Sequence, residues 1–254
     1  MSDTASDSIL LRADPEHGGI RFVTVLTIAF GLLAGFLLIR ALLGIFAQGS
    51  LLIEFTTALS CIGAVPLALL FGWLVERYLK KTWLSGQEFE LSGSELHFRG
   101  ISPEDGSPVT YNLEFKQRVN LTRWYFHLTG YPKAGRERLV SDKWICMACQ
   151  MQQDDERVIA YSYMPPEDAA RWIDNEKLRE PFHELSLSWL YKESGRRLRS
   201  PGTRPKIDSE LLAGPDGRYW IAERRRWAEG LELAPGDFEL LMAHIEAHQP
   251  VQES

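Results

Sequence analysis

The pattern of hydrophobic and polar positions separates an apolar N-terminal region from a mixed remainder. Residues 22–39 contain no charged side chain, and residues 55–75 contain none either. A helix needs about 20 apolar residues to cross the hydrocarbon core of a membrane, and a helix satisfies its own backbone polar groups there. The sequence therefore predicts a membrane α-helical hairpin over residues 20–81. Its two spans are expected at about residues 22–46 and 53–76.

Basic residues flank the predicted hairpin unevenly. Arg12 and Arg21 precede the first span, and the second span is followed by Arg77, Lys80 and Lys81. The connector of residues 41–54 holds no Lys or Arg. Because loops rich in Lys and Arg stay in the cytoplasm, we expect a multi-pass protein of the inner membrane with both termini cytoplasmic. Residues 1–19 are read as an N-terminal tail.

Short alternating segments after the hairpin predict a strand-rich domain over residues 82–180. Apolar residues alternate with polar ones, and turn-forming residues separate the segments. The predicted strands are residues 82–91, 95–99, 111–119, 121–129, 144–152 and 157–163. Pro165 and Pro166 then open a helix to about Arg179, since proline and acidic residues suit a first helical turn.

This order of elements resembles the bacterial membrane proteins that carry a pleckstrin-homology-like (PH-like) domain after a two-helix hairpin. The resemblance covers about residues 20–180 and rests on architecture, with no shared residue motif. It implies a PH-like barrel or sheet whose helix plugs one open end. The expected fold class is thus a membrane hairpin followed by a soluble α+β domain with C-terminal helices.

The last section, residues 183–254, is either an α+β extension or a second unit related to the first. A strand is expected at residues 184–191. A hairpin is expected from residues 209–213 and 218–227 around the turn Gly214-Pro215-Asp216-Gly217, and a helix from Pro235 to about His248. The helix starts Pro166-Glu167-Asp168 and Pro235-Gly236-Asp237 echo each other, although such starts are common.

The motifs that carry chemistry in other proteins are missing or incomplete. Neither a phosphate-binding glycine loop nor a dinucleotide fingerprint is found in the sequence, and the net charge of −6 disfavours nucleic-acid binding. Cys146 and Cys149 form a lone CxxC in a predicted strand, so they point to opposite faces and read as buried core residues. His244 and His248 read as a solvated helix face. We therefore expect no catalytic residue, cofactor or metal, and no enzyme.

Two sets of residues are candidates for binding. A basic set could contact anionic lipid headgroups. It comprises Lys80, Lys81, Arg196, Arg197, Arg199, Arg204 and Lys206. The basic run 224–226, read as part of a strand, cannot share one face. A second set could pack helices closely because its residues are small. It comprises Gly31, Gly35, Ala64, Ala68 and Gly72. Packing within the hairpin explains this set, and a homo-oligomer is the alternative.

These features favour a membrane-anchored cytoplasmic binding or scaffold module. Its partners are expected to be the lipid bilayer and either anionic lipid headgroups or a protein. An accessory subunit of a larger membrane complex is the alternative, and an enzyme that acts on a membrane-proximal substrate is a third hypothesis.

Overall fold

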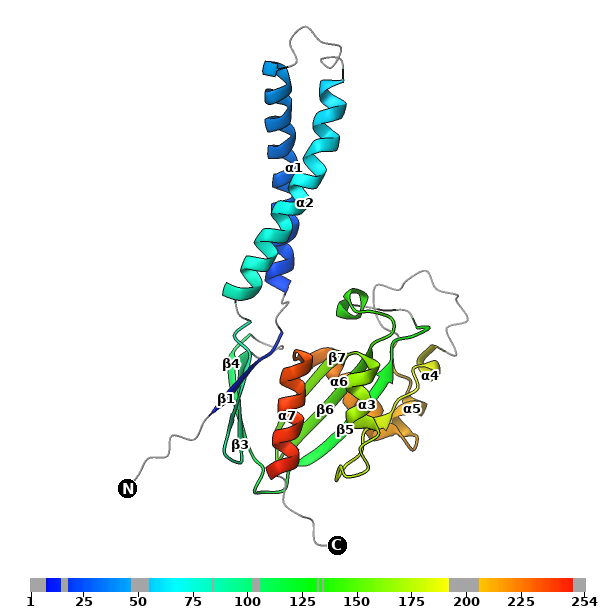
Figure 1. Ribbon diagram of the computed structural model, residues 1–254. Coiled ribbons are helices and arrows are strands. Elements are labelled where there is room, and N and C mark those ends of the chain that lie inside the picture. The colour runs from blue at the N-terminus through cyan, green and yellow to red at the C-terminus, as the bar shows by residue number, and fades with distance from the viewer. Residues whose placement is uncertain are drawn as a thin grey trace, which may run out of the picture. The chain divides into compact units, whose positions relative to one another are not determined.

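The computed structural model describes residues 8–14, 18–46, 55–83, 85–101, 106–131, 133, 135–191 and 206–248 (Figure 1). The chain divides into two compact units. One unit lies within residues 15–85, and the other joins residues 1–14 to residues 86–254. The N-terminal residues therefore belong to the soluble domain, although the hairpin follows them directly in the sequence.

The first unit is a hairpin of two long helices, α1 (Gly18–Phe46) and α2 (Thr56–Thr82). Both are long enough and apolar enough to cross a membrane. They pack through small residues, and the buried positions of α2 recur every four residues from Ser60 to Gly72. This spacing places one stripe on one helix face. The prediction of two apolar helices is confirmed. The strand expected from residue 82 begins later, because α2 continues to Thr82.

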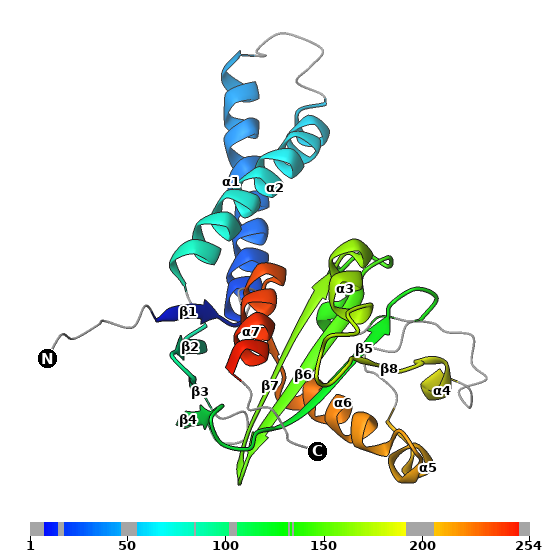
Figure 2. The same ribbon diagram turned by 60° about the horizontal axis from the view of Figure 1, so that its bottom comes forward.

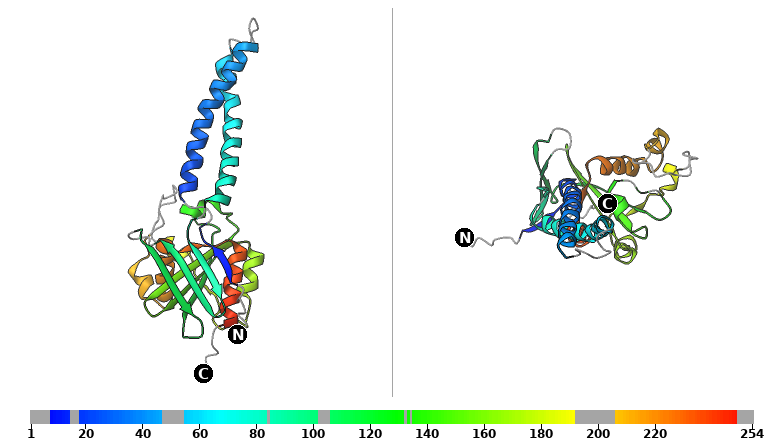
Figure 3. Two further views of the ribbon diagram at one scale, coloured as in Figure 1. Left: turned by 90° about the vertical axis from the view of Figure 1, so that its left-hand side faces the viewer. Right: turned by 90° about the horizontal axis from the view of Figure 1, so that it is seen from above.

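The second unit contains a four-stranded antiparallel sheet in the order β1-β2-β3-β4. Its strands are β1 (Ile9–Arg12), β2 (Glu88–Ser92), β3 (Glu95–Ile101) and β4 (Pro108–Glu114). The left-hand view of Figure 3 shows this sheet face on. Strand β1 corrects the interpretation of residues 1–19 as a tail. Leu11 pairs with Phe89, and both side chains are buried.

A five-stranded sheet forms the centre of the domain in the order β8-β5-β6-β7-β9. Strands β5 (Asn120–His127), β6 (Ile145–Gln153) and β7 (Glu156–Met164) are antiparallel. The two-residue strands β8 (His183–Glu184) and β9 (Leu231–Glu232) add to the edges in parallel. Side chains on both faces of β6 are buried, which explains the uninterrupted apolar run of residues 145–149 in its first half.

Helices cover both faces of the five-stranded sheet (Figure 2). Helices α3 (Pro166–Ile173) and α7 (Pro235–His248) join the core that also contains the four-stranded sheet. Helix α6 (Gly217–Glu229) packs into the core on the other face. Shorter elements complete the domain. They are the 3₁₀ helix η2 (Gly135–Leu139), α4 (Ser188–Tyr191) and α5 (Ser209–Ala213).

The structure confirms a strand-rich α+β region with C-terminal helices, but neither sheet closes on itself. Three local predictions are wrong. Helix α3 ends at Ile173, the segment 184–191 is mainly the turn of α4, and the hairpin at 209–227 is two helices. The turn Gly214–Gly217 precedes a helix, because the buried positions after it recur at helical spacing.

Candidate ligand pocket

A pocket of about 640 Å³ lies between the two sheets of the domain. One wall comes from the ends of β3 and β4, and the other from β7, β9 and the C-terminal turn of α6. The lining is completed by Gly135 of η2, by Asp14 and by Gln87. Cavities of about 300–1,000 Å³ hold drug-sized ligands.

Aromatic side chains line both walls of this pocket. Phe98 and Tyr111 stack with centroids 5.8 Å apart, and Tyr161 meets Tyr163 edge to face at 5.5 Å. Trp227 is 39% exposed, so part of its indole is open to solvent. Such rings offer large apolar area together with polar edges.

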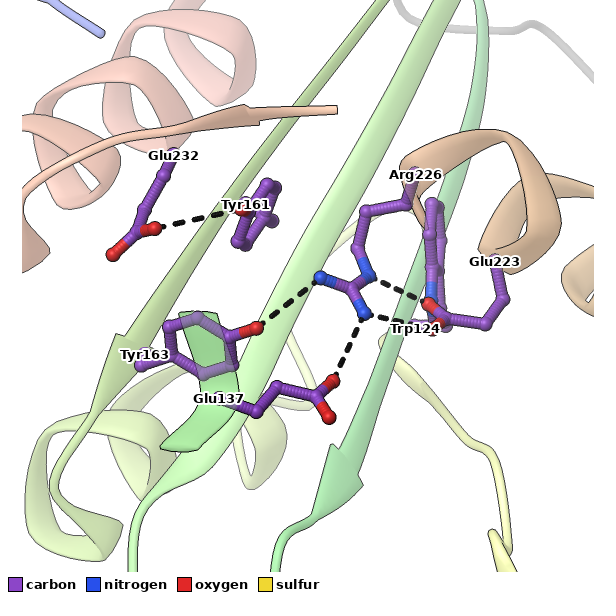
Figure 4. A network of polar contacts seen from close by, with 7 residues as sticks. All are labelled: Trp124, Glu137, Tyr161, Tyr163, Glu223, Arg226 and Glu232. Carbon is purple, nitrogen blue, oxygen red and sulfur yellow. Dashed lines mark hydrogen bonds and ion pairs between the residues drawn. The ribbon is translucent and has the colours of Figure 1, made fainter. Parts of the chain in front are cut away.

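Arg226 is buried in the pocket wall and connects several elements (Figure 4). Its Nε donates to Glu223 Oε2 at 2.8 Å, and its Nη2 donates to Glu223 Oε1 at 2.9 Å. Nη2 also donates to Glu137 Oε1, and Nη1 donates to the hydroxyl of Tyr163, both at 3.4 Å. Trp124 of β5 donates to Glu223 as well, at 2.8 Å.

Arg226, Glu223, Glu137, Tyr163 and Trp124 form a cluster that is called the Arg226 network below. Its buried charged groups are paired with one another. Burial lowers the pKa of Arg226, but Glu223, Cys146 and Tyr163 together outweigh this effect, so the pKa lies well above its ordinary value. Burial raises the pKa of Tyr163 well above its ordinary value, although Arg226 opposes the shift. Arg226 is therefore charged and Tyr163 neutral at physiological pH. Buried charges need partners of this kind, since an unpaired one is costly.

The pocket lining also carries one ion pair and one carboxylate that is bonded to the backbone. Arg157 of β7 contacts Glu229 with an Nη2–Oε1 distance of 2.9 Å. Asp14 accepts a hydrogen bond from the backbone of Glu232 at 3.1 Å and donates its own N–H to the Glu232 carbonyl at 2.7 Å. Asp14 has a φ of 52°, a conformation that aspartate and asparagine tolerate better than most residues.

A second buried arginine, Arg123 of β5, lies outside the lining of this pocket. Its Nη1 donates to the carbonyl of Glu180 at 3.1 Å and contacts Glu246 Oε1 at 2.5 Å. Burial raises the pKa of the neighbouring Cys149 thiol to about 11, against a smaller opposing effect of Arg123. Burial also raises the pKa of Glu180.

The basic residues that the sequence singled out belong to both units of the chain. Lys80 and Lys81 lie in the last turn of α2, where Lys80 forms an ion pair with Glu76 at 2.8 Å, and Lys206 precedes α5 in the other unit. The other basic residues of the set lie outside the described residues. They are Arg196, Arg197, Arg199 and Arg204.

The run 224–226 was assigned to a strand, and this assignment is wrong. It lies in α6, where Arg224 is exposed, Arg225 bonds to Gln150, and Arg226 is buried. A helix turns by about 100° per residue, so three successive arginines face three different environments.

The small residues of the hairpin lie between its two helices. A methyl group on Gly31 would lie 3.3 Å from the Cα of Ala68, and one on Gly35 would lie 3.4 Å from that of Ala64. A methyl group on Gly72 would meet the side chain of Ile28 at 2.5 Å.

Cys146 and Cys149 are buried thiols in cores on opposite faces of β6, as the sequence predicted. His244 and His248 are ring neighbours at 4.4 Å on α7. Burial and His248 lower the pKa of His244. Within the described residues, no group of three or more His, Cys, Asp or Glu side chains could hold a metal ion.

Sequence reasoning missed the Arg226 network. Glu223 and Arg226 are three residues apart, which brings side chains together on a helix but not on a strand. The wrong assignment of this segment therefore hid the pair. A comparison with known proteins finds no matching family model, no matching curated protein and no matching solved structure.

Proposed function

We propose that this protein is a membrane-anchored binding module. Helices α1 and α2 anchor it, and the domain receives a small ligand in the pocket between β4 and β7. The observation that carries the proposal is the cavity of about 640 Å³ with aromatic walls. The Arg226 network supports it by fixing one of those walls.

Strand addition at the edge of the four-stranded sheet is a less favourable binding mode. The outward N–H groups of Asn112 and Glu114 on β4 donate to the side chains of Glu156 and Gln153, each at 2.8 Å. Pro108, at the start of β4, has no N–H to offer. Blocked edges of this kind oppose pairing with another chain.

Strand pairing and charge support the proposed orientation. Strand β1 precedes the hairpin and pairs with β2, which follows it, and this pairing supports a topology with both ends of the hairpin on one side of the membrane. The excess of basic residues beside these ends favours the cytoplasm as that side, in a multi-pass protein of the inner membrane. The PH-like relationship belongs to the same proposal, and it is supported by strands β2 to β7 followed by helix α3, which packs into the core through Ala169.

The other hypotheses have less support from the geometry. The small residues that motivated an accessory subunit or a homo-oligomer pack inside the hairpin. Both oxygens of the Glu223 carboxylate bind Arg226, so this group is a poor proton acceptor for catalysis. Two further binding modes are compatible with a ligand in the pocket. We propose that the basic residues contact anionic lipid headgroups or that the domain contacts a protein partner.

The test is ligand binding by the full-length protein in nonionic detergent. We suggest labelling it with 5-fluorotryptophan, assigning the Trp227 resonance with Trp227→Phe, and titrating the uncharged probe naphthalen-2-ylmethanol. The proposal predicts a saturable shift of the Trp227 fluorine resonance, because the probe enters beside this indole. The partly exposed Trp172 of α3, outside the pocket lining, serves as the internal reference.

A matched pair of variants locates the binding site. Ala228→Trp adds a bulky ring to an exposed position of the pocket lining, and Ala243→Trp adds the same ring to an exposed position of α7. Ala228→Trp should abolish the shift, and Ala243→Trp should retain it. No shift at millimolar probe, or an equal shift in both variants, would overturn the proposal.

A further inference from the structure

We infer that the pocket selects an organic cation, a ligand with an aromatic or apolar body and a positively charged amine-type group. This inference rests on the proposed function and specifies the chemical class of its ligand. It follows from the charges around the pocket and from the aromatic residues that line it.

Negative charge exceeds positive charge among the described groups that line the pocket or contact its lining. Three arginines lie there, namely Arg157, Arg225 and Arg226. Five carboxylates lie there, namely Asp14, Glu137, Glu223, Glu229 and Glu232. The sum is −2, so an anionic ligand would meet net repulsion and a cation net attraction.

Arg226 does not make the pocket an anion site, although it lies in the wall. Glu223 binds it with both oxygens, and Glu137 binds it from η2. Its guanidinium carbon also lies 4.7 Å from the ring centroid of Tyr161 and 5.2 Å from that of Phe126. The positive group is therefore already neutralised by carboxylates and covered by rings.

A cationic ligand in the cavity would meet the same kinds of group, aromatic rings and carboxylates. Tyr111, Tyr163 and Trp227 line the cavity, and aromatic faces attract cations within about 6 Å of the ring centroid. Asp14 adds a carboxylate to the lining, and Glu229, which is paired with Arg157, adds a second one. The domain thus stabilises its own buried cation, Arg226, with carboxylates and aromatic rings, and it presents the same two kinds of group to the cavity.

The uncharged body of the ligand has a matching surface. Phe98, Ile101 and Val109 form an apolar part of the wall, and Ile101 is 48% exposed. A flat aromatic body can stack there while its charged end meets the carboxylates. A small inorganic cation would leave this apolar surface uncovered, so the inference commits to an organic cation.

The experiment compares three probes that share one naphthalene ring. They are the neutral naphthalen-2-ylmethanol, the cationic (naphthalen-2-ylmethyl)trimethylammonium and the anionic naphthalen-2-ylacetate. Each is titrated into the full-length, 5-fluorotryptophan-labelled protein, with free concentrations measured by dialysis against empty micelles. We expect the cation to bind at least about ten-fold more tightly than the anion, with the neutral probe between them.

One substitution isolates the charge from the structure. Asp14→Asn keeps the oxygen that accepts the hydrogen bond of Glu232 and tolerates the φ of 52°, while it removes one negative charge. It should lower the affinity for the cation by about three- to ten-fold relative to the affinity for the neutral probe. The control Asp216→Asn, outside the lining, should change neither.

The outcomes separate the two proposals. The inference about charge fails if the anion binds as tightly as the cation, or if Asp14→Asn leaves the affinity for the cation unchanged. If the neutral probe still binds in that case, the proposed ligand pocket is retained. If no probe shifts the Trp227 resonance, the proposed function fails together with the inference about charge.

Discussion

Leu11 of β1 pairs with Phe89 of β2, although the whole membrane hairpin lies between them in the sequence. Both side chains are at most 1% exposed and belong to the core shared with α7. The hairpin is thus inserted between two neighbouring strands of one sheet. The N-terminal residues contribute to the stability of the soluble domain, and the next residues, Ala13 and Asp14, connect β1 to β9.

Truncation of Leu11 should destabilise the soluble domain. Leu11→Ala leaves a cavity in the core, and such a change costs about 2–5 kcal/mol of unfolding free energy. Urea unfolding followed by near-ultraviolet circular dichroism measures it. Leu10→Ala, at a position that is 47% exposed, is the matched control and should cost much less. Equal stability of the two variants would show that β1 is not part of the folded domain.

Breaking the Arg226 network should destabilise the domain as well. Arg226→Met removes the cation and leaves Glu223 and Glu137 buried without it, and breaking a buried pair costs about 3–5 kcal/mol. Arg224→Met, at an exposed position of the same helix, should have little effect. The double variant Arg226→Met with Glu223→Gln should recover part of the loss, because one orphaned charge is removed. Additive losses in the double variant would contradict direct coupling.

Glu180 should make stability depend on pH. Burial raises its pKa in the folded state, so the folded protein binds this proton more tightly than the unfolded chain does. The contribution of Glu180 is then fully present below the ordinary glutamate pKa of about 4.5 and is lost as pH rises through the folded value. Urea midpoints of Glu180→Gln relative to the unmodified protein should therefore rise from pH 4.5 to pH 7. Glu176→Gln, at an exposed position, should show no such trend. A falling difference for Glu180→Gln would reverse the sign and contradict this reading.

Long, regular helices and strands could be predicted from the sequence. Short elements and contacts between distant residues could not. The two apolar helices, strands β5 to β7 and helix α7 follow from length and periodicity alone. Strand β1 has four residues and depends on pairing with β2, so its local pattern carries little information. Helix α6 was mistaken for a strand because Gly214–Gly217 has the composition of a hairpin turn. The Arg226 network joins residues of α6, β5, β7 and η2. It depends on the tertiary structure and therefore could not be predicted from the sequence pattern.

The membrane topology of the anchor is tested most directly by cysteine labelling of the full-length protein in a bacterial host. In a Cys61→Ala background, single cysteines replace Ser8 before β1, Ser50 in the connector and Lys116 after β4. A membrane-impermeant maleimide is applied to intact and to permeabilised spheroplasts, and Cys146 and Cys149 stay unreactive because they are buried. A membrane-anchored domain built from both ends of the hairpin predicts that Ser50→Cys reacts in intact spheroplasts. Ser8→Cys and Lys116→Cys should react only after permeabilisation. Labelling of Ser8→Cys and Lys116→Cys from opposite sides, or of all three positions from the same side, would contradict the account.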